Sequence, residues 1–259
     1  MNIIDITDEE LKNIDLTSFI KGEALYGNSD SSLENTFVKG KEFYLKMVQD
    51  RTQFTGGRVL DLLSGHGRWL PFLSAFNDEV IAIERIEKSQ LLAKRLCDYF
   101  DIKNVKFLTG DVSLIENIKK ETIDYVWLWS GLQYISRDYA LNQVRRVLRP
   151  GGRIFVGAYN GPGLMIEHVK NGIKNGMLFE GASKWALTGL AKGPLDNGEP
   201  NFIDLDSCSE ICEMYGFRLI VAASSGNIDI TDSRNVERIE PASHVDGYVR
   251  TVEFIAEKK

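Results

Sequence analysis

Apolar runs of strand length alternate with segments of helical periodicity along the chain from residue 58 onward. Short continuous apolar runs are typical of buried strands, whereas apolar residues spaced three and four apart are typical of a helix packed on one side. The predicted strands are RVLDLL (58–63), EVIAIE (79–84), NVKFLTGD (104–111), TIDYVWLW (122–129), RIFVGAY (153–159), FRLIVAA (217–223) and YVRTVEFIAE (248–257).

Helical segments lie between these strands. The predicted helices are GRWLPFLSAF (67–76), KSQLLAKRLCDYF (88–100) and RDYALNQVRRVL (137–148), the last ended by the turn signal RPGG (149–152). In the second helix the expected apolar positions are Leu91, Leu92, Leu96, Tyr99 and Phe100. Alternation of strands and helices predicts an α/β fold with a doubly wound, mostly parallel sheet and helices on both faces.

Three segments depart from this rhythm. The first 50 residues carry no strand signal, and FVKGKEFYLKMVQ (37–49) predicts a helix beside the core. Residues 160–206 interrupt the alternation with glycines, prolines and two helix-like pieces, and residues 226–246 form a long polar loop. We therefore expect one domain over 1–259, with 1–50 as an N-terminal helical cap and 160–206 as an insertion after the fifth strand.

Composition narrows the class of protein. The chain has 31 basic and 37 acidic side chains, a formal charge of −6, and no basic block with interleaved aromatics. Because phosphate neutralisation supplies much of the affinity for nucleic acid, this balance disfavours a nucleic-acid ligand. The N-terminus lacks the pattern of a signal peptide, and no apolar run is long enough to span a bilayer. The expectation is a cytoplasmic protein without a membrane partner.

The three cysteines are an odd number, which argues against a disulfide framework. Cys208 and Cys212 are four residues apart and share a helical stripe with Ile211 and Tyr215. Neither a histidine nor a third cysteine lies nearby in the sequence to complete a metal site. We therefore predict a core-facing helix stripe and no metal.

Polar and glycine residues gather where the predicted strands end. In parallel sheets ligands bind outside the carboxyl ends of the strands. A carboxylate there can accept both hydroxyl protons of a ribose, and glycine allows close backbone approach. The residues at these ends predict a nucleoside site: Asp61, Ser64, Gly65, His66 and Gly67 after the first strand, Glu84 and Arg85 after the second, Gly110 and Asp111 after the third, and Trp129 and Ser130 after the fourth.

The first of these turns decides between nucleoside ligands. A dinucleotide site uses G-x-G-x-x-G, but here Leu70, preceded by Trp69, stands where the third glycine is expected. This bulk disfavours a pyrophosphate and hence a nicotinamide-dependent oxidoreductase. Leu63 precedes the turn, and as a leucine it is expected to keep a negative φ, which leaves close approach to Gly65 and Gly67.

The set of motifs resembles the class I S-adenosylmethionine-dependent methyltransferases. That family has V-L-D-L-G-x-G-x-G, matched here from Val59 to Gly67 except at Leu63, an acidic residue ending the second strand, G-D after the third, and L-R-P-G-G before the fifth. The resemblance covers residues 55–160 and implies a seven-stranded, Rossmann-like fold with an antiparallel last strand. It also implies an enzyme whose cofactor is S-adenosyl-L-methionine.

The resemblance implies a role for each cofactor residue. Asp61 and the backbone from Ser64 through Gly65 and His66 to Gly67 would surround the methionine moiety. Glu84 would bind the ribose, with Arg85 near the adenine. The adenine edge would contact Asp111 and Val112, which follow Gly110, and the ammonium group would face Trp129 and Ser130.

The methyl acceptor is less constrained. Family members that methylate nucleic-acid amines carry an Asn/Asp-Pro-Pro-aromatic turn, which LWSGLQYI (128–135) lacks, so a small molecule is expected. An alcohol acceptor benefits from a general base, and His168 and His244 are the candidates. The candidates for contact with the acceptor are Tyr134, Tyr159, Asn160 and Trp185. The aromatic rings among them could also face a cationic product.

These observations favour O-methylation of a small molecule. The alternatives that remain open are N-methylation of a small amine or amino sugar, and a non-catalytic partner subunit that binds S-adenosylmethionine. A homo-oligomer is compatible with the sequence.

Overall fold

The computed structural model describes residues 3–15, 36–37, 39–183, 203–230 and 244–259. The chain divides into two compact units, the first made of residues 1–118 with 123–125 and the second of residues 119–122 with 126–259. Whether these units act as the single expected domain stays a prediction.

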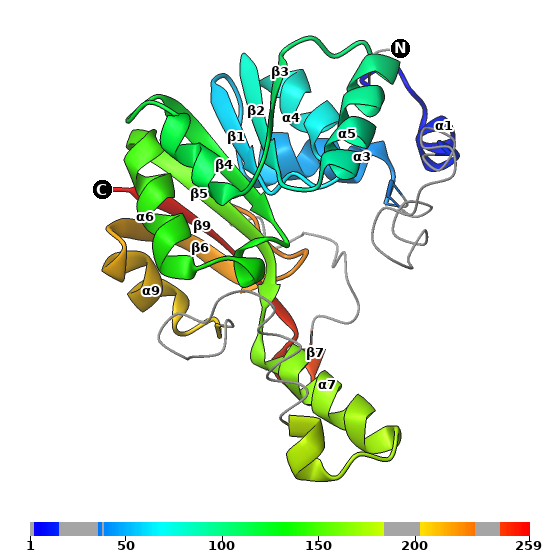
Figure 1. Cartoon of the computed structure of the whole chain (residues 1–259), viewed down its shortest axis with the longest axis vertical. Coiled ribbons are helices and arrows are strands. Elements are labelled where there is room, and N and C mark those ends of the chain that lie inside the picture. Colours follow the sequence, from blue (N-terminus) through cyan, green and yellow to red (C-terminus); the bar gives the residue numbers. More distant parts are fainter. Residues whose placement is uncertain (1–2, 16–35, 38, 184–202, 231–243) are drawn as a thin grey trace. The chain divides into compact units, whose positions relative to one another are not determined.

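The first unit begins with short helices and continues into the first three strands (Figure 1). Its elements are α1 (Asp8–Lys12), α3 (Lys41–Lys46), the π-helix η2 (Met47–Arg51), β1 (Arg58–Leu62), α4 (Leu70–Phe76), β2 (Glu79–Glu84), α5 (Glu87–Tyr99), β3 (Val105–Thr109) and the 3-10 helix η3 (Val112–Asn117). The helix predicted in 37–49 is therefore confirmed from Lys41 onward, where α3 begins.

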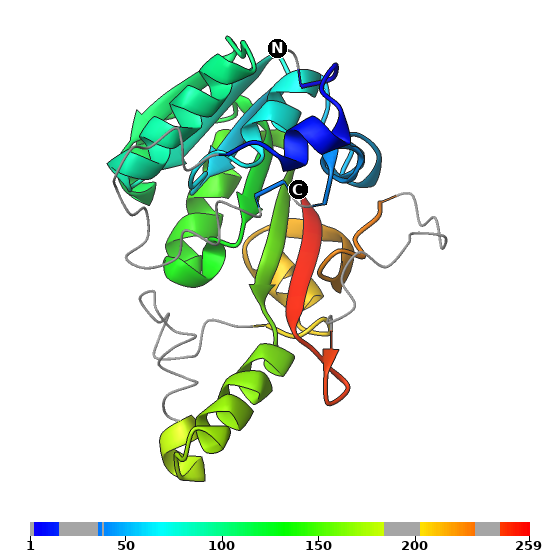
Figure 2. The same cartoon turned by 90° about the vertical axis from the view of Figure 1, so that its right-hand side faces the viewer.

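The second unit holds the rest of the chain, apart from the first residues of β4. Its elements are β4 (Ile123–Trp129), η4 (Leu132–Tyr134), α6 (Arg137–Val147), β5 (Leu148–Asn160), α7 (Pro162–Lys174), α9 (Cys208–Met214), β6 (Phe217–Ser224), β7 (His244–Val245), β8 (Tyr248–Val249) and β9 (Thr251–Lys258). Figure 2 shows α7 extending beyond the end of β5, with the β7–β8 hairpin beside its first turn.

Within the described residues one sheet has seven strands in the order β3-β2-β1-β4-β5-β9-β6. β2 is parallel to both β1 and β3, whereas β9 is antiparallel to both β5 and β6. The predicted fold class, a doubly wound and mostly parallel sheet with an antiparallel last strand, is confirmed.

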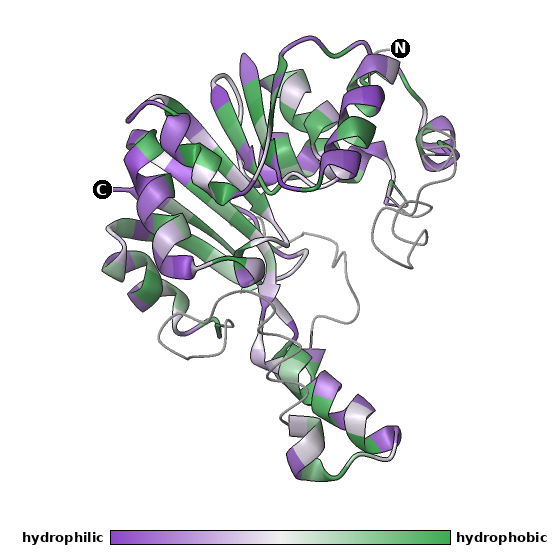
Figure 3. Cartoon of the chain, viewed as in Figure 1, coloured by the Kyte–Doolittle hydropathy of each residue, from purple (hydrophilic) through white to green (hydrophobic). Residues whose placement is uncertain are grey.

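Burial explains why these segments form these elements. Four of the five β1 residues and five of the six β2 residues are buried, and both strands are mostly hydrophobic in Figure 3. α6 begins at its N-cap Ser136, whose hydroxyl accepts a hydrogen bond from the Tyr139 N–H. Its predicted apolar face is buried at Leu141, Val144, Val147 and Leu148.

Two sequence expectations were wrong. In α5, Leu91 and Tyr99 are exposed, because the buried stripe runs through Leu92, Ala93, Leu96 and Cys97. RPGG does end the helix, but it is no separate turn, because β5 starts at Leu148 and includes all four residues. Gly151, with φ of 74°, provides the backbone conformation that this strand start needs.

The core-facing position of the two cysteines is confirmed: Cys208 and Cys212 are buried on α9, and burial raises the pKa of both thiols to about 12. Among the described residues no cluster of side chains suited to a metal ion is present. In the same part of the chain, no helix combines the length and hydrophobicity that crossing a bilayer requires.

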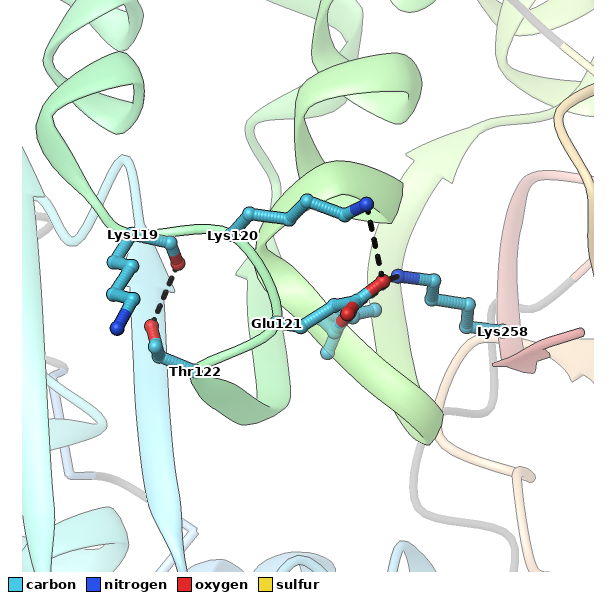
Figure 4. Close-up of polar contacts among 6 residues, drawn as sticks. Lys119, Lys120, Glu121, Thr122 and Lys258 are labelled. Carbon is cyan, nitrogen blue, oxygen red and sulfur yellow. Dashed lines mark hydrogen bonds and ion pairs between the residues drawn. The ribbon is translucent and has the colours of Figure 1, made fainter.

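A buried lysine ties the start of β5 to the last strand. Lys258 is 8% exposed and donates to the Leu148 carbonyl at 2.6 Å and to Glu121 at 3.3 Å. Figure 4 shows that Lys120, which is exposed, points at the same carboxylate, at 3.6 Å. The carbonyl of a buried residue would lose its charged donor if Lys258 were replaced.

We expect Lys258→Met to lower the free energy of unfolding by about 1–3 kcal/mol, the usual cost of leaving a buried polar group unpaired. Lys120→Met is the matched control, because it removes an exposed partner of the same Glu121 and should change stability by less than about 0.5 kcal/mol. Urea denaturation followed by circular dichroism measures both variants. Equal effects would show that the Leu148 contact contributes nothing of its own.

Candidate functional site

In the first unit, the carboxyl ends of β1 and β2 place two buried carboxylates beside a glycine turn. Asp61 is 3% exposed and Glu84 is 6% exposed. The strands are in parallel register, with Asp61 opposite Ala82, so Glu84 ends β2 beside the turn that follows β1. The backbone N–H of Gly65 donates to Glu84 Oε2 at 2.9 Å, and that of Ile86 donates to Oε1 at 2.7 Å.

Asp61 has a different environment. Its Oδ2 is buried and, within the described part of the chain, has no hydrogen-bond partner; the same holds for Ser64 Oγ. Burial, reinforced by the negative charge of Glu84, raises the pKa of Asp61 to about 8. At neutral pH this carboxyl therefore holds a proton, which a cationic ligand would displace.

The turn itself is closed by backbone bonds. The Ser64 N–H donates to the Ile83 carbonyl, and the Gly67 N–H donates to the Ser64 carbonyl, both at 3.0 Å. Gly65 and Gly67 have φ of 58° and 83°. A Cβ at Gly67 would lie 2.7 Å from the Cβ of Ala93 on α5, so a side chain there has no room. Both glycines thus adopt a conformation that favours glycine, and at Gly67 there is in addition no room for a side chain.

Leu63 contradicts the sequence expectation. Its φ is 62°, in the left-handed region that leucine avoids, not negative as predicted. The chain therefore adopts at Leu63 the backbone conformation for which glycine is suited. Strain of this kind is typical of functional turns, where the surrounding structure holds it in place.

His66, also in this turn, is partly buried. Burial and the nearby positive charge of Arg68 lower its pKa to about 4, so the ring is neutral at physiological pH. Its Nε2 lies 3.2 Å from the Thr36 hydroxyl.

The end of β3 supplies the remaining predicted residues of the first unit. Gly110 donates its N–H to the Glu84 carbonyl at 2.9 Å and has φ of 154°. Asp111 is exposed and caps η3, its Oδ1 accepting from the N–H and hydroxyl of Ser113. These bonds hold the pKa of Asp111 below its usual range. Arg85 is exposed, and Val112 begins η3. The structure thus brings the predicted residues of β1, β2 and β3 to the carboxyl ends of adjacent strands.

In the second unit, the ends of β4 and β5 are interlocked. The Ser130 N–H donates to the Gly157 carbonyl at 2.8 Å, and a Cβ at Gly157 would lie 2.4 Å from Cε3 of Trp129. Ser130 and Ala158 have φ of 53° and 51°, and β5 carries a register shift between Val156 and Tyr159. Non-glycine residues with positive φ therefore occur after β1, after β4 and near the end of β5.

The predicted acceptor residues differ in exposure. Tyr134 is 49% exposed, whereas Tyr159 is completely buried and hydrogen-bonds Arg137, a residue that sequence reasoning missed. Asn160 is buried, and its carbonyl accepts the Ile203 N–H at 3.0 Å. Trp185 lies outside the described residues. Tyr134 is thus the one predicted contact that the described residues leave open to solvent.

Both candidate bases lie on one part of the second unit. His168 is on α7, and His244 is in the two-residue strand β7, not in an irregular loop as expected. The helix and the hairpin are joined by ion pairs, Arg250 to Glu167 at 2.6 Å and Lys170 to Asp246 at 2.5 Å. Gly161 adds an N–H bond to the Arg250 carbonyl at 3.0 Å. The two histidines therefore share one local scaffold.

Because Leu63 occupies a glycine-like conformation, we expect Leu63→Gly to keep the free energy of unfolding within about 1 kcal/mol of the original. Relief of ~1–2 kcal/mol of left-handed strain offsets lost packing and added chain entropy. Gly67→Ala should lower it by more than about 2 kcal/mol, because the new Cβ meets Ala93 at a positive φ. Urea denaturation measures the free energy of unfolding of both variants. If Leu63→Gly loses more stability than the stated limit, Leu63 does not hold a strained, glycine-like conformation.

Part of the sequence matches a known protein family. Residues 59–152 match the family model described as a methyltransferase domain. No curated protein matches the chain.

Solved structures resemble the chain over nearly its whole length at low identity. A geranyl diphosphate methyltransferase in complex with S-adenosylmethionine has a TM-score of 0.59 at 15% identity, with 95% of each chain covered. The geranyl diphosphate C-methyltransferase from Streptomyces coelicolor A3(2) has a TM-score of 0.57 at 14% identity, covering 92% of this chain and 89% of that one. A [4+2]-cyclase, SpnF, has a TM-score of 0.56 at 16% identity, covering 85% and 82%.

At such identities the likeness establishes the fold alone, and the domain model adds a sequence match over residues 59–152. The matched segment runs from β1 into β5 and contains the glycine turn and both buried carboxylates. The chain therefore carries a segment that matches a methyltransferase domain, set in the fold of the methyltransferases to which it is similar.

Proposed function

We propose that the chain transfers a methyl group from S-adenosylmethionine to an oxygen atom of a small molecule. The observation that carries the donor site is the buried pair Asp61 and Glu84 beside the glycine turn. The unpartnered oxygens of Asp61 and Ser64 fit a ligand with an ammonium group and other polar atoms. When bound, S-adenosylmethionine supplies an electrophilic methyl group.

Each donor-site residue has a role that its environment supports. Asp61, made neutral by burial, would ionise against the ammonium group of the methionine moiety. A carboxylate has about four acceptor positions, so Glu84 can accept ribose hydroxyls while it keeps its two backbone bonds. Asp111 uses Oδ1 to cap η3, which leaves Oδ2 for the adenine amine.

The second unit would supply the acceptor site. His168 or His244 would take the proton of an alcohol as it attacks the methyl group, since a neutral imidazole has a nitrogen that can accept a proton. The exposed Tyr134 would contact the acceptor. Methyl transfer is an in-line displacement, so the main contribution of these residues is to orient the acceptor and exclude water.

A carbon acceptor is the second candidate. Two of the three solved structures described above are geranyl diphosphate methyltransferases, one of them named a C-methyltransferase. A nitrogen acceptor, such as a small amine or amino sugar, needs no dedicated base. One of the similar structures is a [4+2]-cyclase, so the test includes the outcome that the chain transfers no methyl group.

The test uses S-adenosylmethionine labelled in its methyl group with panels of phenols and alcohols, amines, and prenyl diphosphates. We expect label on oxygen, and a loss in kcat of about 100-fold in His168→Ala or His244→Ala, the usual contribution of a general base. Label only on nitrogen or carbon would contradict the O-methyltransferase proposal. Tight binding of S-adenosylhomocysteine with no labelled product from any panel would favour the non-catalytic reading.

A further inference from the structure

A hydrogen bond joins the glycine turn to the segment that precedes α3. His66 Nε2 lies 3.2 Å from the hydroxyl of Thr36, and Thr36 is 1% exposed. The two residues are thirty positions apart in the sequence and belong to the same compact unit. The turn that we assign to the methionine moiety lies between β1 and α4, and it is therefore held by a residue that belongs to neither element.

The surroundings of this contact favour a hydrogen bond between an uncharged His66 ring and the Thr36 hydroxyl. His66 is partly buried and lies near the positive charge of Arg68, and both effects disfavour a second proton on the ring. A neutral imidazole offers one donor and one acceptor nitrogen, and a threonine hydroxyl matches either. The contact is therefore unchanged throughout the neutral pH range.

Thr36 is itself fixed by Tyr44 of α3. The Tyr44 hydroxyl donates to the Thr36 carbonyl at 2.6 Å, in a buried position. Burial raises the pKa of Tyr44 to about 12, so the phenol keeps its proton. Its ring is stacked on Phe72 at 4.7 Å and meets Trp69 edge-on at 5.2 Å.

These contacts form a closed path. The chain runs from His66 through Trp69 to Phe72 of α4, and the packing returns from Phe72 through Tyr44 and Thr36 to His66. The turn inside this path contains Gly67, a residue with wide backbone freedom. A flexible turn binds a ligand more tightly when its surroundings already hold the bound conformation.

We propose that Thr36 and Tyr44 are positioning residues of the methyl-donor site, which act through His66 to hold the Ser64–Gly67 backbone in its binding conformation. This inference rests on the proposed function of that turn. It makes the segment before α3 part of the donor site, and it assigns His66 a role through its ring contact and not through proton transfer.

Thr36→Val is the direct test, since it keeps the shape and removes the hydroxyl. We expect its dissociation constant for S-adenosylhomocysteine, measured by calorimetry, to rise about fivefold or more, the scale of one lost hydrogen bond. Thr36→Ser restores a hydroxyl and should bind within about twofold of the original. Tyr44→Phe, which keeps the stacked ring, should weaken binding in the same direction.

Thr52→Val is the matched control. Thr52 directly follows η2 and is also completely buried, but its hydroxyl donates to the Val48 carbonyl and not toward residues 64–67. It should alter stability without changing affinity. Amide hydrogen exchange at residues 64–67 should speed up in Thr36→Val and stay unchanged in Thr52→Val.

The outcomes separate the two proposals. No binding of S-adenosylhomocysteine by the original chain would overturn the proposed function. Binding by the original chain that Thr36→Val leaves unchanged, or that Thr52→Val weakens equally, would overturn the positioning role alone. If Thr36→Val does not fold, Tyr44→Phe takes its place in the test. Binding of S-adenosylhomocysteine that Tyr44→Phe leaves unchanged, or that Thr52→Val weakens equally, would then overturn the positioning role.

Discussion

Two carboxylates buried at the ends of neighbouring strands determine the chemistry of the proposed donor site. Like charges in a poorly solvated place cannot both ionise cheaply, so the two groups divide the roles. Glu84 accepts the N–H bonds of Gly65 and Ile86 and thereby orders the turn. Asp61 keeps a buried oxygen without a partner in the described part of the chain, and its pKa rises to about 8. This unsatisfied state is costly in the free chain, and a cationic ligand would relieve it.

The sequence predicted the parts of this site that depend on local pattern. Apolar runs located β1 and β2, and the position of Asp61 and Glu84 at their ends follows from strand length alone. The conformation of Leu63 was predicted wrongly, because residue preference favours negative φ and the fold overrides it. The Thr36–His66 contact left no signal, since a threonine thirty residues upstream of a histidine has no periodic relation to it. Contacts of that kind are set by tertiary packing.

The second unit explains why the acceptor is harder to infer than the donor. Its strand ends are held by backbone bonds and close packing at Ser130 and Gly157, which fix a frame without specifying a ligand. Pattern reasoning chose Tyr159 for its position, but its burial depends on the packing of α6 and on Arg137. His168 and His244 came from a residue-type argument, and the structure adds that α7 and the hairpin carry them together. Loops and insertions vary freely on a fixed fold, so the acceptor must be found by experiment.

Calorimetric titration with S-adenosylhomocysteine at pH 7, run in buffers of different ionisation enthalpy, tests the carboxylate pair most directly. Asp61 is protonated in the free chain because its pKa is raised above 7, and a bound ammonium group would lower that pKa again. Binding is therefore predicted to be saturable and to release about one proton, whereas Asp61→Asn should release none. The absence of binding, or binding with no proton released by the original chain, would contradict this account of the site.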